Sequence, residues 1–280
     1  MSVLSTAELE RLLAEDTPFG DLTTDSLDIG GRPGRICFAA RSAMVVAGID
    51  EAKSLLNLAG VRAQVNVHSG QEVEAGATIL TGEGEAGSLH RVWKVAQTLM
   101  EIWSGVASAT RELARAARVG RPDIMIACTR KNVPGTKAMA VAAVKAGGGV
   151  MHRLGLSETV LVFPQHRAFR PRDGFAELAR ALRSRAPEKK LTVEVVTIEE
   201  GAAAAEAGFD VIQAEKFRPG EIAELVARID QMTPRPVVAA AGGINPDNAA
   251  GYARAGADVL VTSWPFTAKP VDVVVTIEPR

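Results

Sequence analysis

The half of the sequence that follows Pro122 limits the possible folds most, because apolar runs there alternate with stretches of helical spacing. The runs are almost continuously hydrophobic, which is typical of parallel strands that are buried on both faces of a sheet. They lie at Ile124–Cys128, Thr159–Phe163, Leu191–Val196, Phe209–Ala214, Pro236–Ala241 and Asp258–Ser263. The intervening helices are expected at about 136–147, 173–185, 198–207, 219–232 and 246–255. This alternation predicts an α/β fold around a parallel sheet.

A weak internal repeat supports that prediction. Residues 207–212 (Ala-Gly-Phe-Asp-Val-Ile) and 255–260 (Ala-Gly-Ala-Asp-Val-Leu) each place a glycine where a helix would end and a strand would begin. Six strands are too few for the usual eight-fold barrel, so the pattern is compatible with a six-stranded barrel or with an open sheet.

The first hundred residues predict a different, α+β arrangement. A helix over 5–15 has Ser5 and Glu8 at the positions of a capping box, and a long helix from Ser88 to about Arg118 has a candidate break at Ser104-Gly105. A further helix is expected at 50–59, with strands at 35–40, 44–47, 61–67 and 78–81. The tail, Val271–Ile277, predicts one more strand that could return to this first sheet.

Composition excludes several classes of function. The 32 basic and 33 acidic residues nearly cancel, and only 4% of residues are aromatic, which argues against nucleic acid or a membrane surface as a partner. No segment approaches the roughly 18 uninterrupted apolar residues of a membrane helix, and the N-terminus lacks a signal-peptide pattern. Cys37 and Cys128 are the only cysteines, too few for a disulfide framework or a cysteine zinc site. We therefore expect a cytoplasmic protein that acts on small molecules.

Ligands of such sheets bind at the C-terminal ends of the strands, and the residues at those ends are informative. A basic set clusters there or beside glycine-rich turns: Arg130, Lys131, Lys137, Lys145, His152 and Arg153. Guanidinium groups suit carboxylates and phosphates, although adjacent cations can also form an ordinary solvated face. Two basic pairs next to glycine-rich turns of the same sheet favour an anion site.

Glu194 and Glu215 lie in or at the end of apolar runs, where a carboxylate is costly unless it is paired or bound to a cation. Ribose hydroxyls or Mg²⁺ would explain them, and a structural salt bridge is the alternative. Gly242-Gly243 could let backbone N–H groups approach a phosphate, or could form only a tight turn. His68 and His166 are expected to be loop or packing residues.

Several of these segments resemble the signature of quinolinate phosphoribosyltransferases, also called nicotinate-nucleotide pyrophosphorylases. The similar segments are Glu15–Thr24 (EDTPFGDLTT), Thr129–Lys137 (TRKNVPGTK), Ala146–Leu156 (AGGGVMHRLGL), Ser104–Ala107, Val193–Val195 and Ala241–Ile244. They occur in family order and span essentially the whole chain. Arg153–Arg167 (RLGLSETVLVFPQHR) is similar to the ModD branch, whose members are called molybdenum transport system proteins or pyrophosphorylases.

The resemblance implies an N-terminal α/β sandwich over residues 1–107, joined by a returning strand at 271–278, and a six-stranded α/β barrel over 108–270 that contains the active site. It implies a homodimer or higher oligomer in which a basic residue of one subunit completes the partner's site. It also implies transfer of a phosphoribosyl group from phosphoribosyl pyrophosphate to a pyridine nitrogen, with Mg²⁺.

The resemblance assigns roles to individual residues. Lys131, Glu194 and Glu215 correspond to catalytic positions, the two glutamates lying near the ribose and the metal. The positions that would bind the acid substrate are Lys94, Arg130, His152, Arg153 and Phe163. The phosphate positions are Gly242, Gly243, Thr262 and Ser263.

Four departures from the family pattern affect the acceptor more than the donor. Lys94 replaces the arginine contributed by the partner, and Phe163 replaces a substrate lysine. Ala241 replaces a serine, and Ser263 replaces a phosphate-loop glycine. The sequence therefore favours a phosphoribosyltransferase with an anionic N-heteroaromatic acceptor other than quinolinate. A genuine quinolinate enzyme of NAD biosynthesis and a non-catalytic protein that binds a nucleotide or an oxyanion such as molybdate are the alternatives.

Overall fold

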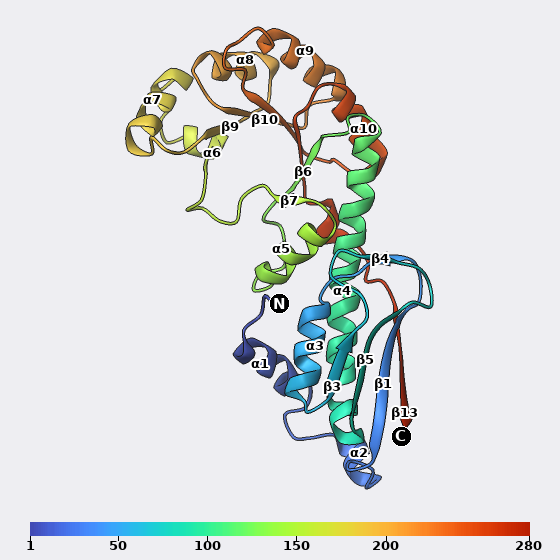
Figure 1. Ribbon diagram of the computed structural model, residues 1–280. Coiled ribbons are helices and arrows are strands. Elements are labelled where there is room, and N and C mark those ends of the chain that lie inside the picture. The colour runs from blue at the N-terminus through green and yellow to red at the C-terminus, as the bar shows by residue number, and fades with distance from the viewer. The chain divides into compact units, whose positions relative to one another are not determined.

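The computed structural model describes residues 1–280, which divide into two compact units. Unit 1 contains Met1–Arg111, Asn132–Gly148 and Pro265–Arg280, and unit 2 contains Glu112–Lys131 and Gly149–Trp264. The long helix α4 (Ala86–Arg118), labelled in Figure 1, contributes its residues up to Arg111 to unit 1 and those from Glu112 to unit 2.

Unit 1 is built on an antiparallel sheet of four strands in the order β13-β1-β5-β3. Their bounds are β13 (Val273–Pro279), β1 (Pro33–Ala40), β5 (Thr78–Glu85) and β3 (Arg62–Val65). A second, two-stranded sheet pairs β2 (Met44–Val45) with β4 (Glu72–Val73). The other helices of the unit are α1 (Thr6–Asp16), α2 (Leu22–Ser26), α3 (Ile49–Leu58) and α5 (Lys137–Ala146).

Local chemistry explains two features of these helices. Helix α1 begins at the predicted capping box, where the Ser5 hydroxyl accepts from the N–H of Glu8 and the Glu8 carboxylate accepts from the N–H of Ser5. The predicted break in α4 is absent. Ser104 is fully buried and its hydroxyl bonds the N–H and C=O of Ala47, while the backbone of Lys269 packs where a side chain at Gly105 would lie. Close packing, rather than a kink, accounts for these two residues.

Unit 2 contains a parallel sheet of seven strands in the order β7-β6-β12-β11-β10-β9-β8. Their bounds are β7 (Val150–Met151), β6 (Met125–Cys128), β12 (Val259–Thr262), β11 (Val237–Ala241), β10 (Val211–Glu215), β9 (Leu191–Val195) and β8 (Val160–Val162). All six predicted runs form strands, and β7 is an additional one. The sheet is curled, and it forms an open half-barrel because β7 and β8 lie at its two edges and do not pair with each other.

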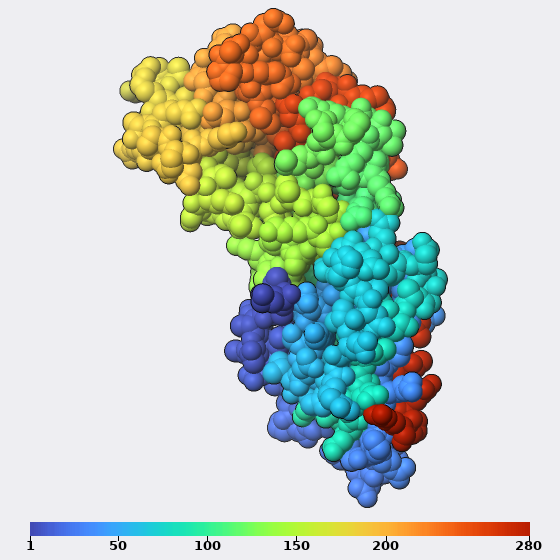
Figure 2. Space-filling model, in the orientation of Figure 1, coloured from blue at the N-terminus to red at the C-terminus, as the bar shows by residue number.

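Helices cover the outer face of this half-barrel (Figure 1). They are α7 (Phe175–Arg185), α8 (Ile198–Glu206), α9 (Pro219–Ile229) and α10 (Pro246–Arg254). A short helix, α6 (Pro164–Arg167), follows β8, and a 3₁₀ turn, η1 (Trp264–Thr267), follows β12. In the space-filling view of Figure 2, the atoms of α7 to α9, coloured yellow to orange, form a continuous outer surface.

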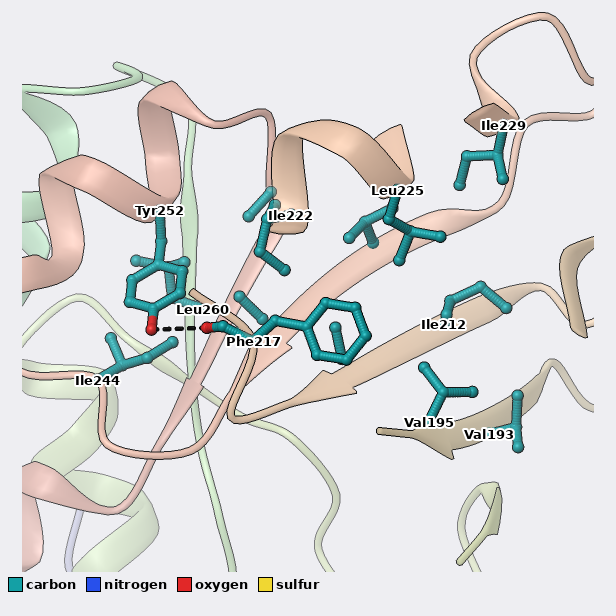
Figure 3. Close-up of a cluster of buried hydrophobic side chains, with 14 of the residues drawn as sticks. Val193, Val195, Ile212, Phe217, Ile222, Leu225, Ile229, Ile244, Tyr252 and Leu260 are labelled. Atoms are coloured by element: carbon teal, nitrogen blue, oxygen red, sulfur yellow. Dashed lines mark hydrogen bonds between the residues drawn. The ribbon is translucent and has the colours of Figure 1, made fainter. Parts of the chain in front are cut away.

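Side chains alternate along each strand, so the two faces of the half-barrel differ. On the outer face, Val193, Val195 and Ile212 join Ile222 and Leu225 of α9 in one buried cluster, which Figure 3 shows. The buried Tyr252 hydroxyl donates to the carbonyl of Phe217 at 2.8 Å in the same region. The inner face carries smaller buried side chains: Ala127, Ala239, Ala241 and Val261.

The aspartates of the internal repeat join neighbouring strands where those strands begin. Asp210 accepts from the N–H of Leu191 at 2.6 Å and from Arg183 at 2.7 Å. Asp258 accepts in the same way from the N–H of Val238 and from Arg235, both at 2.8 Å. The repeat therefore recurs because each copy supplies the same strand-to-strand connection.

No helix of the structure is both long enough and apolar enough to cross a membrane.

Asp258 gives a first test of this fold. Burial opposes its ionisation, but the hydrogen bonds from Val238, Arg235 and Arg121 outweigh that effect and lower its pKa. Asp258→Asn should reduce the free energy of unfolding by about 2 kcal/mol, because two arginines lose a charged partner. A lowered pKa stabilises the fold above the ordinary carboxyl range, so the deficit should be constant from pH 8 to 5 and should shrink below about pH 4.

The matched control is Asp123→Asn, since Asp123 also pairs with Arg121 but its side chain is 73% exposed. That variant should lose much less stability, because water screens an exposed ion pair. Equal losses for the two variants, measured by urea unfolding, would contradict the role assigned to Asp258.

Candidate active site

Strand alternation places three polar side chains on the inner face of unit 2. Val193 and Val195 point outward, so Glu194 points inward, and the same alternation turns Gln213 and Glu215 inward from β10. Gln213 is paired in register with Glu194 and donates a hydrogen bond to Glu194 Oε2 at 2.9 Å. Its own Oε1 is buried and has no hydrogen-bond partner. The inner face therefore holds two carboxylates and one unused amide oxygen.

Neither glutamate makes the salt bridge that was the structural alternative. Burial raises the pKa of Glu194, and the negative charge of Glu215 raises it further. The hydrogen bond from Gln213 and the charge of Arg167 lower that pKa by less. Arg167 forms its ion pair with Glu200 instead, at 2.8 Å. The carboxylate pair therefore lacks a direct counter-ion within the chain.

The chemistry of these oxygens fits Mg²⁺ only in part. Carboxylate and amide oxygens are the ligands that Mg²⁺ prefers, and a cation would relieve the repulsion between Glu194 and Glu215. However, no group of three or more His, Cys, Asp or Glu side chains converges to form a complete metal site. Since Mg²⁺ is commonly held by one or two carboxylates together with substrate phosphates, these residues fit an ion that arrives with a diphosphate.

Four of the predicted basic residues follow β6 and β7. Arg130 and Lys131 are exposed after β6, whereas His152 is half-buried and Arg153 is only 7% exposed after β7. Burial lowers the pKa of Arg153, and the charge of Arg130 lowers it further. Burial and the charge of Arg153 also lower the pKa of His152, which favours its neutral form. Like charges thus gather here and none of these side chains makes an ion pair with a carboxylate, which indicates an anion site.

The remaining two members of the predicted basic set belong elsewhere. Lys137 and Lys145 lie on α5, which is part of unit 1, and both are exposed. These two lysines fit the alternative interpretation of the basic set, an ordinary charged face exposed to solvent.

Arg153 also contacts the residue that follows β8. Its guanidinium carbon lies 5.5 Å from the centroid of the Phe163 ring, a cation–π distance. Phe163 stacks in turn on His166, at 5.8 Å between centroids, and His166 Nδ1 accepts from the N–H of Phe163 at 2.9 Å. The contact between Arg153 and Phe163 spans the two unpaired edges of the sheet, and it gives the site a flat aromatic wall.

The Gly242-Gly243 loop after β11 has the features of a phosphate cradle. Both glycines have positive φ, 92° and 73°, and neither N–H donates a hydrogen bond within the chain. Asn248 donates to the carbonyl of Gly243 at 3.0 Å, and Asn245 caps α10 by accepting from Asp247. The side chains of Asn245 and Asn248 thus fix the conformation of the loop, while its backbone N–H groups stay available for an anion.

The predicted phosphate residues after β12 differ in availability. The buried Thr262 hydroxyl donates to the carbonyl of Ile244 at 2.7 Å and accepts from the N–H of Trp264 at 3.0 Å. Ser263 is half-buried and makes no hydrogen bond through its side chain. Thr262 therefore shapes the loop, and Ser263 has the hydroxyl that is available to a ligand.

Lys94 is the predicted site residue that lies in unit 1. It is exposed, donates to Gln97 Oε1 at 3.2 Å and lies 5.5 Å from the centre of the Trp93 ring. It lines a groove of about 600 Å³ within that unit, together with residues of α1 and α4 such as Leu12, Thr98 and Trp103. The unit 2 residues are thus brought to one edge of their sheet, and Lys94 is not among them.

Sequence reasoning missed three residues that support the site. Gln213 orients Glu194, Asn248 holds the glycine loop, and the positive charge of Arg167 acts on Glu194. Gln213 could have been found from the sequence, since it is a polar residue in an otherwise apolar strand and the alternation of side chains places it on the same face as Glu215. Arg167 and Asn248 act through tertiary contacts that no local pattern predicts.

Comparison with known proteins decides the family. The model of the quinolinate phosphoribosyl transferase C-terminal domain matches residues 106–276, and that of the N-terminal domain matches residues 21–104. The chain belongs to the quinolinate phosphoribosyl transferase family. A Rhodobacter capsulatus protein named "Putative pyrophosphorylase ModD" is 44% identical over 256 residues, 91% of this chain and 98% of the relative.

Relatives with another name are more distant. A Methanocaldococcus jannaschii protein named "Probable nicotinate-nucleotide pyrophosphorylase [carboxylating]" is 30% identical over 275 residues, 96% of this chain and 95% of the relative. Relatives named ModD are 37% to 44% identical, which confirms the predicted resemblance to that branch.

Solved structures confirm the predicted fold class. The structure of NadC from Streptococcus pyogenes has a TM-score of 0.90 at 24% identity and covers 100% of both chains. The nicotinate-nucleotide pyrophosphorylase from Ehrlichia chaffeensis also has a TM-score of 0.90 at 24% identity and covers 98% of this chain and 99% of that chain.

Glu194 provides the test of the site's electrostatics. Glu194→Gln should raise the melting temperature of the free protein at pH 7, because it removes a desolvated charge beside Glu215 and keeps an acceptor for Gln213. A gain of up to about 1 kcal/mol is expected. Since the folded state raises this pKa, the ionised carboxylate opposes folding only above the ordinary carboxyl range. The gain should therefore vanish near pH 4.

Melting curves of the wild type and the variant from pH 4 to pH 8 measure this difference. A variant that is less stable than the wild type at pH 7 would show that Glu194 is structural.

Proposed function

We propose that this protein transfers a phosphoribosyl group from phosphoribosyl pyrophosphate to the ring nitrogen of a planar, anionic N-heteroaromatic acid other than quinolinate. The family assignment makes it a pentosyltransferase of the pyrophosphorylase type. One observation carries the finer proposal: the inward carboxylates, the cationic cluster and the free glycine amides all lie at the C-terminal ends of one parallel sheet. That is where such sheets bind ligands.

The central strands suit the donor. The amides of Gly242 and Gly243, with Ser263, would hold a phosphate, and Glu194 and Glu215 would face the ribose. As the bond between C1 of the ribose and pyrophosphate breaks, positive charge develops on the sugar. The carboxylates stabilise that charge more strongly than they do the neutral ground state, so they lower the barrier.

The strands at the edges suit the acceptor. Arg130 and Arg153 can bind a carboxylate in bidentate geometry, and the Phe163 ring can lie against a flat heterocycle. This orientation would place the ring nitrogen toward C1, where its lone pair forms the new bond. Lys131, which is exposed beside Arg130, would help to hold the departing pyrophosphate. Mg²⁺, bound with the diphosphate near Glu194 and Glu215, would neutralise charge on that leaving group.

Pyrophosphate release tests the proposal directly. The protein is incubated with phosphoribosyl pyrophosphate and Mg²⁺, and with one member at a time of a panel of pyridine, pyrimidine and imidazole carboxylates that includes quinolinate. We expect release that depends on one class of acid, and release with quinolinate that is about ten- to a hundredfold weaker.

Two results would overturn the proposal. Efficient turnover of quinolinate would assign the chain to quinolinate chemistry itself. Thermal stabilisation by phosphoribosyl pyrophosphate or by molybdate, without pyrophosphate release for any acid, would indicate a binding protein. The molybdate arm also tests the molybdenum link that the ModD resemblance suggests, which remains a prediction.

Phe163 is the residue on which acceptor choice should depend. Phe163→Lys should increase turnover of quinolinate about tenfold, because a second carboxylate gains a charged donor. The same change should lower the melting temperature of the free protein, since it replaces a cation–π contact to Arg153 with a like charge. Added quinolinate should reverse that loss.

Phe163→Leu is the control, because it removes the ring without adding charge. It should lower the melting temperature of the free protein and should not increase turnover of quinolinate. A Phe163→Lys variant with unaltered turnover of quinolinate would count against a substrate-facing Phe163.

Lys94 tests whether active sites are shared between subunits. Lys94→Ala and Glu194→Gln should each be nearly inactive alone. In a mixed dimer, one of the two sites combines an intact Lys94 with an intact Glu194, so the isolated mixed dimer should recover about half of the wild-type activity. Co-expression of the two variants with different tags isolates the mixed dimer, and an inactive mixed dimer would show that Lys94 does not act on a partner's site.

A further inference from the structure

Lys216 has an unusual backbone conformation beside the glycine loop. Its φ is 60°, and the only other non-glycine residue with a positive φ is Asp28. Aspartate and asparagine tolerate this region because their short side chains bond the local backbone, whereas lysine has no such compensation. Lys216 is held there by its N–H, which donates to the carbonyl of Ala241 at 2.7 Å. Strain of this kind concentrates at functional sites.

The conformation sets the Lys216 side chain against Gly242. A Cβ atom added to Gly242 would lie 2.8 Å from Lys216 Cγ and 3.0 Å from Glu215 Oε1. The lysine side chain therefore leaves the backbone in contact with the residue whose N–H group is available to an anion. The same contact requires glycine at position 242.

The ammonium group of Lys216 has no acidic partner. Lys216 is exposed and makes no ion pair, although Glu215 is its neighbour in the chain. The nearby Arg218 differs, because it pairs with Glu221 at 3.1 Å. A flexible, unpaired cation beside free backbone amides is the arrangement that binds phosphate groups.

We propose that Lys216 is a phosphate-binding residue, whose ammonium group completes the site formed by the Gly242-Gly243 loop. The inference rests on the proposed function, and it assigns to Lys216 a phosphate group of the phosphoribosyl donor. That group is either the 5-phosphate or the diphosphate, which share the chemistry that Lys216 recognises. The strained backbone serves to direct the side chain along the loop.

The variant Lys216→Asn separates binding from folding. Asparagine accepts a positive φ, so the free protein should melt about 2 °C higher than the wild type. The dissociation constant for phosphoribosyl pyrophosphate, measured by calorimetry, should rise about tenfold and should depend less on salt. Lys216→Arg should restore most of the affinity. Lys190→Asn is the matched control, because Lys190 is exposed and unpaired but precedes β9, at the opposite end of the strands.

Two smaller probes identify the phosphate that Lys216 contacts. If ribose 5-phosphate loses affinity for Lys216→Asn and inorganic pyrophosphate does not, the residue binds the 5-phosphate. The reverse pattern assigns it to the diphosphate. Either result supports the inference.

The outcomes that overturn it are distinct from failure of the proposed function. If the wild type binds phosphoribosyl pyrophosphate and Lys216→Asn binds it equally well, only the role of Lys216 is wrong. If the variant loses affinity and also melts below the wild type, Lys216 is structural and the inference fails. If the wild type binds none of the three phosphates, the proposed function and the inference fail together.

Discussion

The guanidinium of Arg153 lies over the ring of Phe163, and this contact spans the only gap in the parallel sheet of unit 2. Strands β7 and β8 have no hydrogen bonds to each other, so the curvature of the sheet alone would leave two free edges. A buried cation that packs on an aromatic ring contributes attraction without neutralising its charge. The half-barrel is thereby bridged at the same point where it keeps an unpaired positive charge for an anion.

Buried charges have partners at one end of the strands and lack them at the other. Where the strands begin, Asp210 and Asp258 each accept hydrogen bonds from a backbone N–H and from an arginine, so buried charge is compensated. Where they end, Glu194 has a raised pKa and Arg153 a lowered one, because burial and then a nearby like charge disfavour the ionised form of each. A fold can keep such unpaired charges only if the rest of the structure is stable enough. A bound ligand of opposite charge then supplies the partner that these charges lack in the free protein.

The sequence predicted features that depend on local periodicity or on a capping pattern. The six long apolar runs, the Ser5 capping box and the two carboxylates in or at the end of apolar runs are of this kind. Strand β7 was not predicted, because only Val150 and Met151 pair within a glycine-rich segment. The break expected at Ser104-Gly105 was wrong, since tertiary packing against Ala47 and Lys269 keeps the helix continuous. The positive charge of Arg167 lowers the pKa of Glu194 although the two residues lie far apart in the sequence. Such an effect depends on the tertiary fold and cannot be inferred from the sequence around either residue.

The order of the strands also separates the two halves of the proposed reaction. Apart from Lys131, the donor residues lie in or follow the central strands β9 to β12, where neighbouring strands on both sides fix their positions. Acceptor residues follow β6, β7 and β8, and the latter two are edge strands of two and three residues. A substitution after an edge strand alters one wall of the site and leaves the hydrogen-bonded ladder of the centre intact. Phe163 lies at such a position, so a change of acceptor there need not disturb the loop and the carboxylates that would hold the phosphoribosyl donor.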